Sequence, residues 1–212
     1  MNILTSPLLE SVPWIEHGFG TRYAPLSQDG MASLRQIQSD LSLVADRPEG
    51  CVGEGDALLT AEPGVTVSVR TADCFPVLLV DLHHHAVAAV HAGWRGSADG
   101  VVAKTLRRMR DEFRTNAADI SAAIGPGIGA CCYQVGQEVA RRFGLAQAEW
   151  ARAGRLDLAA ENQRQLMECG VPRESISLAG LCTFCDPARF YSWRRDRESA
   201  GRMISYIRMV KR

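Results

Sequence analysis

The sequence lacks the features of several broad classes of protein. It holds no apolar run of the roughly 18–20 residues that a membrane span requires. Residues 1–20 combine neither a cationic start nor a long apolar stretch, so we expect no signal peptide. Neither sign of charge is in excess, because 24 Lys and Arg residues face 24 Asp and Glu residues. We therefore expect neither a membrane nor a nucleic acid as a partner.

A disulfide framework and an internal linker are also missing. Seven cysteines is an odd count in a chain of 212 residues without an export signal, so we expect free thiols and a cytoplasmic protein. The nearest candidate linker, residues 144–154, contains Leu145 and Trp150 and is interpreted as a surface loop. With 46% hydrophobic residues the chain has a globular composition, and we expect one domain over residues 1–212.

The apolar pattern predicts alternating strands and helices. Strands are expected where apolar residues alternate or run consecutively, and helices where they recur every three or four positions. The pattern also contains an Asp as N-cap of the last helix and a Gly after its end. These signals predict an α/β (α+β) protein with strands in residues 65–69, 75–81, 86–92, 120–124, 175–181 and 202–210, and helices in 97–113, 135–143 and 157–169.

Two of these strands predict a site by counting alone. If residues 75–81 and 86–91 form one hairpin, residues 82–85 make its turn. Cys74 and His91 then meet at the open end, roughly 20 Å from the turn at about 3.3 Å per residue. The turn contains three consecutive histidines, which are too far from His91 to share a ligand and are interpreted as a solvated turn.

A cysteine beside a histidine has two chemical uses. Thiolate and imidazole are good ligands for Zn²⁺ or copper, and they also form a nucleophile–base pair. A buried structural cysteine with a hydrogen-bonded histidine is the alternative without a function. Asp73 next to Cys74, and Gly93 and Gly96 after His91, favour a functional site, because glycine lets backbone approach closely.

The remaining cysteines of the later motifs are interpreted as structural. Residues 124–132 are rich in glycine but lack the spacing of a dinucleotide-binding loop, and Cys131 and Cys132 are expected to be buried thiols. Cys182 and Cys185 form one CxxC motif, which by itself cannot close a tetrahedral zinc site. No second pair is evident, so a structured turn is expected there.

Several ordered segments resemble one known family. They read TADCFPVLLVD, HAGWRG, IGPGIGACCYQVGQEV and GLCTFCDPARFYSWRRD followed by GRMISYI, and an earlier HGFGTR resembles the family's opening strand. Together they make the chain similar, over about residues 55–207, to the YfiH-like family, also called the laccase-domain or multicopper polyphenol oxidoreductase family. The resemblance implies a layered α/β/β/α fold with mixed β-sheets.

The resemblance also implies a metal and an activity. Family members bind one metal, usually zinc, with copper as the other possibility, through two histidines and a cysteine. The activities attributed to them are phosphorolysis of adenosine, inosine, guanosine or methylthioadenosine, and deamination of adenosine. Cys74 and His91 match two of the ligand positions, and Asp73 is a candidate to orient a ligand or carry a proton.

This sequence departs from the family at the third ligand. The family's first histidine belongs to a Gln-Val-His motif ahead of an Ala-Asp-Ala segment. Residues 55–57, Gly-Asp-Ala, match that segment, so Gln38 of RQIQ occupies the histidine position. An amide is a weaker zinc ligand than imidazole, so Cys74, His91 and Gln38 are expected to hold metal weakly. A stretch of loop and helix usually found before this motif is also missing.

Phosphorolysis requires cations that hold inorganic phosphate, and the planar guanidinium suits that task. Among the arginines beside the motifs, Arg22 and Arg95 are the candidates. The sequence therefore predicts a purine nucleoside phosphorylase, possibly also an adenosine deaminase, acting as a monomer or homodimer. A degenerate nucleoside-binding homologue without catalysis and a metal-free Cys74–His91 thiol hydrolase are the alternatives. Five histidines are too few for a multicopper oxidase.

Overall fold

The computed structural model describes residues 3–24, 27–48, 50–144 and 154–210. The expected surface loop over residues 144–154 therefore lies almost entirely outside the described residues. Two six-stranded sheets form the centre of the molecule. We call them sheet A and sheet B after the order in which the chain enters them.

Each sheet mixes parallel and antiparallel neighbours. In each sheet two neighbouring pairs of strands run parallel and three run antiparallel. Sheet A has the order β1 (Ile3–Leu4), β2 (Ile15–Gly20), β12 (Met203–Met209), β7 (Thr66–Thr71), β3 (Ala32–Arg35), β5 (Gly50–Glu54). Sheet B has the order β11 (Ile176–Leu178), β10 (Ile120–Ile124), β8 (Phe75–Asp81), β9 (Ala86–Ala92), β6 (Ala57–Thr60), β4 (Ser42–Val44).

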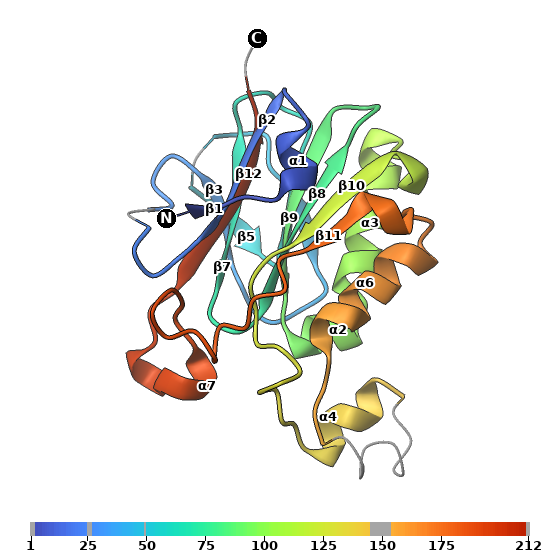
Figure 1. Ribbon diagram of the computed structural model, residues 1–212. Helices are drawn as coiled ribbons and strands as arrows, with labels where there is room; N and C mark the ends of the chain where they lie inside the picture. The colour runs from blue at the N-terminus through green and yellow to red at the C-terminus, as the bar shows by residue number, and fades with distance from the viewer. Residues whose placement is uncertain (1–2, 25–26, 49, 145–153, 211–212) are drawn as a thin grey trace.

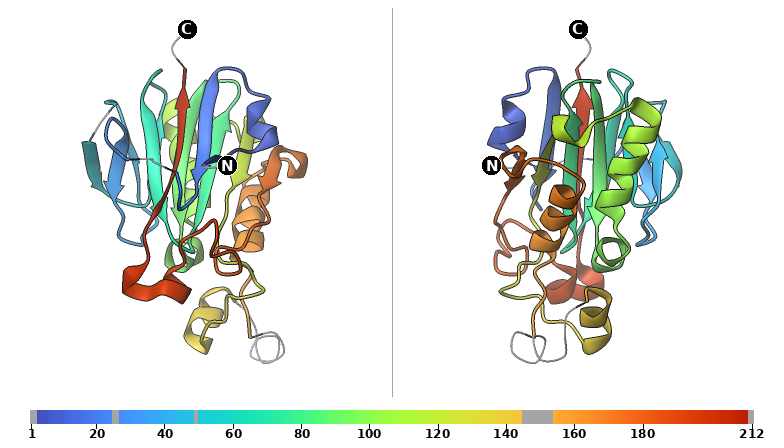
Figure 2. Two further views of the ribbon diagram at one scale, coloured as in Figure 1. Left: turned by 60° about the vertical axis from the view of Figure 1, so that its left-hand side comes forward. Right: turned by 90° about the vertical axis from the view of Figure 1, so that its right-hand side faces the viewer.

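Helices cover the outer face of sheet B. Figures 1 and 2 show α3 and α6 side by side over that face, with sheet A on the opposite side. The α-helices of the described residues are α1 (Pro7–Glu10), α2 (Trp94–Ala98), α3 (Val101–Phe113), α4 (Gln137–Arg142), α6 (Leu158–Glu168) and α7 (Trp193–Asp196). Short 3₁₀ turns are η1 (Ala117–Asp119), η2 (Arg173–Ser175) and η3 (Arg197–Ser199). The expected fold of stacked mixed sheets with helices is confirmed.

Two hydrophobic cores lie on the two faces of sheet B. In β8, Val77 and Leu79 pack with the helices, whereas Leu78 and Val80 pack with sheet A, because successive side chains of a strand point to opposite faces. All seven residues of β8 and of β9 are buried, as the consecutive apolar runs predicted. In β12, by contrast, every second residue is buried, since only one face of sheet A is covered.

One expected helix is divided. Residues 97–113 form the end of α2 and all of α3, separated at Gly100. Gly100 has a φ of 81°, a left-handed conformation that interrupts a helix and that glycine adopts without steric cost. The helical spacing is still correct, because Val102, Leu106 and Met109 are buried. In α6, Asp157 accepts a hydrogen bond from Ala160 N, which confirms the predicted N-cap.

Candidate functional site

Three strand ends meet at one end of sheet B. Cys74 directly precedes β8, His91 is the second-last residue of β9, and Asp56 directly precedes β6. The hairpin predicted by counting is confirmed, because Asp81 pairs with Ala86 at the turn and Pro76 pairs with His91 at the open end. Gly93 leaves room for the thiol there: a Cβ on Gly93 would lie 3.0 Å from Cys74 Sγ.

Asp56 orients the ring of His91. Its Oδ1 lies 2.7 Å from His91 Nδ1, and its backbone carbonyl accepts a hydrogen bond from His91 N at 2.7 Å. Since a carboxylate only accepts hydrogen bonds, Nδ1 carries a hydrogen and Nε2 is left to face the site. The Asp56 side chain is fully buried and His91 is 7% exposed, so this contact is shielded from water.

The electrostatics of the pair favour a protonated histidine. Burial lowers the pKa of His91, but the charge of Cys74 and the hydrogen bond to Asp56 raise it by more, to about 10. Burial likewise raises the pKa of Asp56, but its hydrogen bonds to His91 and Ser39 lower it by more, so that it lies below its usual value. At neutral pH the arrangement is therefore an ionised Asp56 beside a charged His91.

Gln38 lies beside the same carboxylate. Its backbone N donates to Asp56 Oδ1 at 3.2 Å, within a loop whose Ser39 N and Oγ both donate to Asp56 Oδ2. Its side-chain Oε1 accepts a hydrogen bond of 2.6 Å from Arg95 Nη1. The structure thus brings Gln38, Arg95 and His91 together around Asp56, with the amide oxygen of Gln38 already occupied.

Asp73 joins three loops rather than facing open space. It has a φ of 82°, which is uncommon for a residue other than glycine. Its carboxylate accepts hydrogen bonds from Thr183 Oγ1 at 2.7 Å and from Arg194 N at 2.6 Å, and its carbonyl accepts one from Ile128 N at 2.8 Å. Both carboxylate oxygens are therefore engaged, and the strained backbone sets the position of the adjacent Cys74.

The two candidate arginines have different neighbours. Arg95 lies with its guanidinium 4.3 Å from the ring centre of Trp94. Arg22 donates to the carbonyl of Pro187 and lies 4.9 Å from the ring centre of Tyr191. Among the described residues, Arg95 contacts Gln38 in the loop beside His91, whereas Arg22 contacts the segment of Pro187 and Tyr191 near the C-terminus.

Cys74 and His91 supply only two of the ligands that a metal site requires. A thiolate and an imidazole are suitable zinc donors, and Asp56 orients His91 as a carboxylate orients many metal-bound histidines. Among the described residues, however, no third His, Cys, Asp or Glu joins them in a group. The remaining candidate is the Gln38 amide, whose oxygen is bound by Arg95. This donor set does not fit a three-ligand catalytic zinc site.

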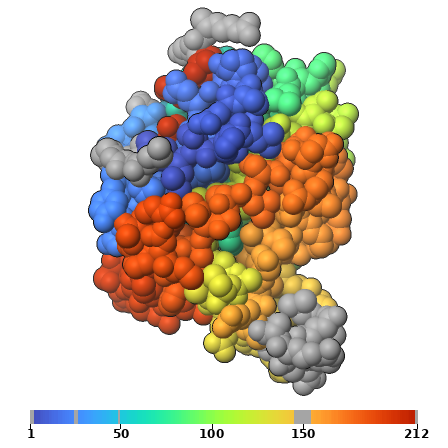
Figure 3. All heavy atoms as spheres, viewed as in Figure 1, coloured from blue at the N-terminus to red at the C-terminus, as the bar shows by residue number. Residues whose placement is uncertain are grey.

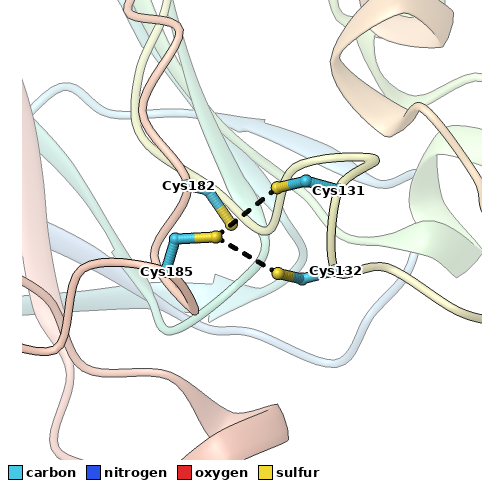
Figure 4. Close-up of side chains that lie close together, drawn as sticks. All are labelled: Cys131, Cys132, Cys182 and Cys185. Carbon is cyan, nitrogen blue, oxygen red and sulfur yellow. Dashed lines mark hydrogen bonds between the residues drawn. The ribbon is translucent and has the colours of Figure 1, made fainter.

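Four cysteines instead form a group at a second place. The Sγ atoms of Cys131, Cys132, Cys182 and Cys185 all lie within 4.8 Å of one another (Figure 4). Two expectations were therefore wrong. Cys131 is exposed and Cys132 is half-buried, because both lie in a surface turn rather than in the core. The CxxC motif does have a second pair, which the chain supplies from a distant loop.

Sequence reasoning missed two residues of the site. In the sequence, Asp56 is only the middle residue of the Gly-Asp-Ala segment that matches the family. The signal that identifies it is its position directly before β6, the strand that pairs with β9 and so brings Asp56 next to His91. Tyr133 is buried, and the guanidinium of Arg194 lies 5.4 Å from the centre of the Tyr133 ring. Burial and the charge of Cys74 raise the pKa of the Tyr133 hydroxyl, which therefore stays protonated near the site.

Among the described residues, none of the helices is both long and apolar enough to cross a membrane.

Comparisons with known proteins place this chain in a family and match its fold. A family model described as "Multi-copper polyphenol oxidoreductase laccase" matches residues 21–210. A purine nucleoside phosphorylase of Clostridium acetobutylicum is 41% identical over 179 residues, which are 82% of this chain and 75% of that protein. The structure is similar to that of YlmD from Geobacillus stearothermophilus, with a TM-score of 0.88, 26% identity and coverage of 100% and 97% of the two chains. It is also similar to YfiH of Bacillus licheniformis, with a TM-score of 0.86, 27% identity and coverage of 99% and 97%.

Proposed function

This chain belongs to the multi-copper polyphenol oxidoreductase laccase family. Since relatives 39–41% identical to it are named purine nucleoside phosphorylases, we propose that it is an enzyme that cleaves purine nucleosides with inorganic phosphate. The observation that carries the proposal is the arrangement at the strand ends: Asp56 binds His91, and His91 lies beside Cys74. Arg95 is held next to this group by Gln38.

In the proposed reaction a phosphate oxygen bonds to C1′ of the ribose while the bond from C1′ to the purine nitrogen breaks. Arg95 binds the phosphate through charge-assisted hydrogen bonds. His91, held protonated by its two neighbours, donates the Nε2 proton to the departing purine. The products are ribose 1-phosphate and the free base. Asp56 and Asp73 act as positioning residues, for His91 and for Cys74 respectively.

No step of this mechanism passes through a metal. Zinc, or copper in its place, would be held by Cys74 and His91 with Gln38 as a poor third ligand, and such a site binds weakly. Deamination of adenosine, which the resemblance implied, relies on a metal-activated water. We therefore assign phosphorolysis as the main activity and expect deamination to be low.

The test is the release of free purine from adenosine and from inosine by the purified protein, with and without phosphate. We expect phosphate-dependent release that falls by about 100-fold or more in His91→Gln, since general acid catalysis contributes roughly 10²–10⁴-fold. Cys51→Ser, which alters an exposed cysteine of β5, is the matched control and should keep wild-type activity. A wild-type protein that binds nucleoside without phosphate-dependent turnover would contradict the proposal and select the non-catalytic homologue.

A metal-free thiol hydrolase is the second candidate. The order Asp56, His91, Cys74 is that of an acid–base–nucleophile triad, and triads are recognised by such geometry. This function predicts that iodoacetamide labels Cys74 rapidly and that labelling stops ester hydrolysis. It also predicts no dependence on phosphate, which separates it from the phosphorylase.

A further inference from the structure

The cysteine group joins two loops that are far apart in the sequence. Cys131 and Cys132 lie in the turn after β10, and Cys182 and Cys185 lie in the segment after β11. The loops already touch through a parallel bridge between Gly127 and Cys182. Figure 3 shows the yellow segment around residue 130 at the surface beside the orange segment that leads to the second pair.

The spacing of the sulfur atoms fits one small ion. Cys185 Sγ lies 3.2 Å from Cys132 Sγ and 3.6 Å from Cys131 Sγ. Four sulfurs at about 2.3 Å from a tetrahedral Zn²⁺ are separated from each other by about 3.8 Å, so the observed cluster is close to the required size. A disulfide requires about 2.05 Å between two sulfurs, and all four thiols are free.

The local backbone directs the four side chains to one point. Neighbouring residues of an extended strand point in opposite directions, but Cys132 N and Tyr133 N both donate to Gly129 O, which makes a turn at this place. The turn allows adjacent Cys131 and Cys132 to face the same partners. On the other side, Gly129 N donates to Cys182 Sγ at 3.3 Å, a contact that stabilises a thiolate.

We propose that Cys131, Cys132, Cys182 and Cys185 bind one zinc ion in a closed tetrahedral site, separate from the site of Cys74 and His91. Four thiolates without an open position are typical of structural zinc, and an all-sulfur tetrahedral set selects soft metals. The ion is bound at a half-exposed surface position, which gives it a path from solvent.

This ion stabilises the loops that hold the candidate active site. Thr183, between the two cysteines of the CxxC motif, donates to Asp73, the neighbour of Cys74. Arg195 Nη1 donates to the carbonyls of Thr183 and Phe184 at 2.9 and 3.1 Å, so the CxxC turn is also joined to α7. Zinc would therefore hold the loop of Cys131 and Cys132 against the CxxC segment, which contacts Asp73 beside Cys74. The site does not rest on the proposed phosphorylase activity.

The test is metal content per chain, measured by mass spectrometry of protein purified without oxygen, together with zinc affinity by competition with a chromogenic chelator. We expect one zinc in the wild type, one in Cys74→Ser, and an affinity at least 100-fold lower in Cys185→Ser and in Cys131→Ser. Cys51→Ser and Cys169→Ser are the matched controls and should retain the ion. Cobalt should give the intense bands of a tetrahedral thiolate site in Cys74→Ser and lose them in Cys185→Ser.

A second measurement needs no variant. Zinc should protect the four clustered cysteines of the wild type from iodoacetamide, whereas exposed Cys51 is labelled, and a chelator should remove that protection. Equal labelling of all exposed cysteines with and without zinc would overturn the proposal. So would a disulfide among the four in protein kept reduced, or a zinc content unchanged by Cys131→Ser and Cys185→Ser. None of these readouts involves nucleoside turnover, so the proposal of a zinc site and the proposal of phosphorylase activity can each be contradicted without the other.

Discussion

His91 Nδ1 lies 2.7 Å from Asp56 Oδ1, and the same carboxylate accepts three backbone N–H groups from the loop that carries Gln38. One buried acid therefore fixes both the ring of His91 and the loop beside it. Removing its charge is expected to disturb the site in two ways at once.

Asp56→Asn should lower turnover about 10–100-fold, the usual effect of removing a group that orients a functional histidine. It should also lower the free energy of unfolding by roughly 1–3 kcal/mol, because donors of the loop lose a charged partner. Ser39→Ala is the control, since it removes one hydroxyl donor to Asp56 and leaves the contact with His91 in place. Wild-type turnover in a folded Asp56→Asn protein would show that Asp56 does not position His91.

Gln38→His should increase zinc binding at Cys74 and His91. Gln38 has a left-handed φ of 59°, which histidine tolerates better than most residues, and its side chain lies beside the same Asp56 loop. The measurement is zinc affinity in a Cys185→Ser background, so that the cysteine cluster does not contribute. Gln38→Asn is the matched control. If zinc affinity stays at the background level, Gln38 does not occupy the third ligand position.

Arg95→Ala should raise the KM for phosphate about 10–100-fold, since a hydrogen bond to a charged group is worth roughly 1.5–3 kcal/mol. The KM for the nucleoside should change less, because the proposed contact is with phosphate alone. Initial rates at varied phosphate and varied inosine separate the two. Arg208→Ala, which breaks a surface ion pair with Glu16 on sheet A, should change neither constant. An equal rise in both constants would remove Arg95 from the phosphate site.

Asp81 should make the hairpin turn sensitive to acid. Burial raises the pKa of Asp81, but the N–H groups of His84 and His83, at 2.9 Å from Oδ1, lower it by more, so the pKa lies below its usual value. Its contribution to stability is therefore complete above the unfolded pKa of about 3.9 and is lost as the pH falls through the lower folded pKa.

Asp81→Asn should thus be less stable than the wild type by about 1 kcal/mol at pH 7, the order of one hydrogen bond. The difference should begin to shrink as the pH falls below about 4, where the unfolded carboxylate takes up a proton, and should be smallest below the lower folded pKa, where the wild-type carboxylate is also neutral. Urea unfolding at several pH values measures it. Asp111→Asn, at an exposed position of α3, is the control. A stability difference that does not depend on pH would show that the charge of Asp81 is not involved.

Much of the fold follows from local patterns. The apolar runs of β8 and β9 predicted a buried hairpin, and counting from its turn placed Cys74 beside His91, because an antiparallel pair has one register once its turn is fixed. The Asp157 cap of α6 was predicted in the same way. The strands between residues 32 and 60 were not predicted, since β3, β4 and β6 are only three or four residues long and show little periodicity.

The sequence by itself determined the hairpin, the helix caps and the pair of Cys74 and His91, because these depend on residues close together in the chain. Only the tertiary structure decided which distant residues join them. Asp56 reaches His91 because β6 pairs with β9, and Cys131 and Cys132 meet Cys182 and Cys185 because β10 runs parallel to β11. Pairings of this kind are set by which strands become neighbours in a sheet, a property that no local periodicity contains. For that reason a lone CxxC motif in the sequence became one half of a four-cysteine site in the fold.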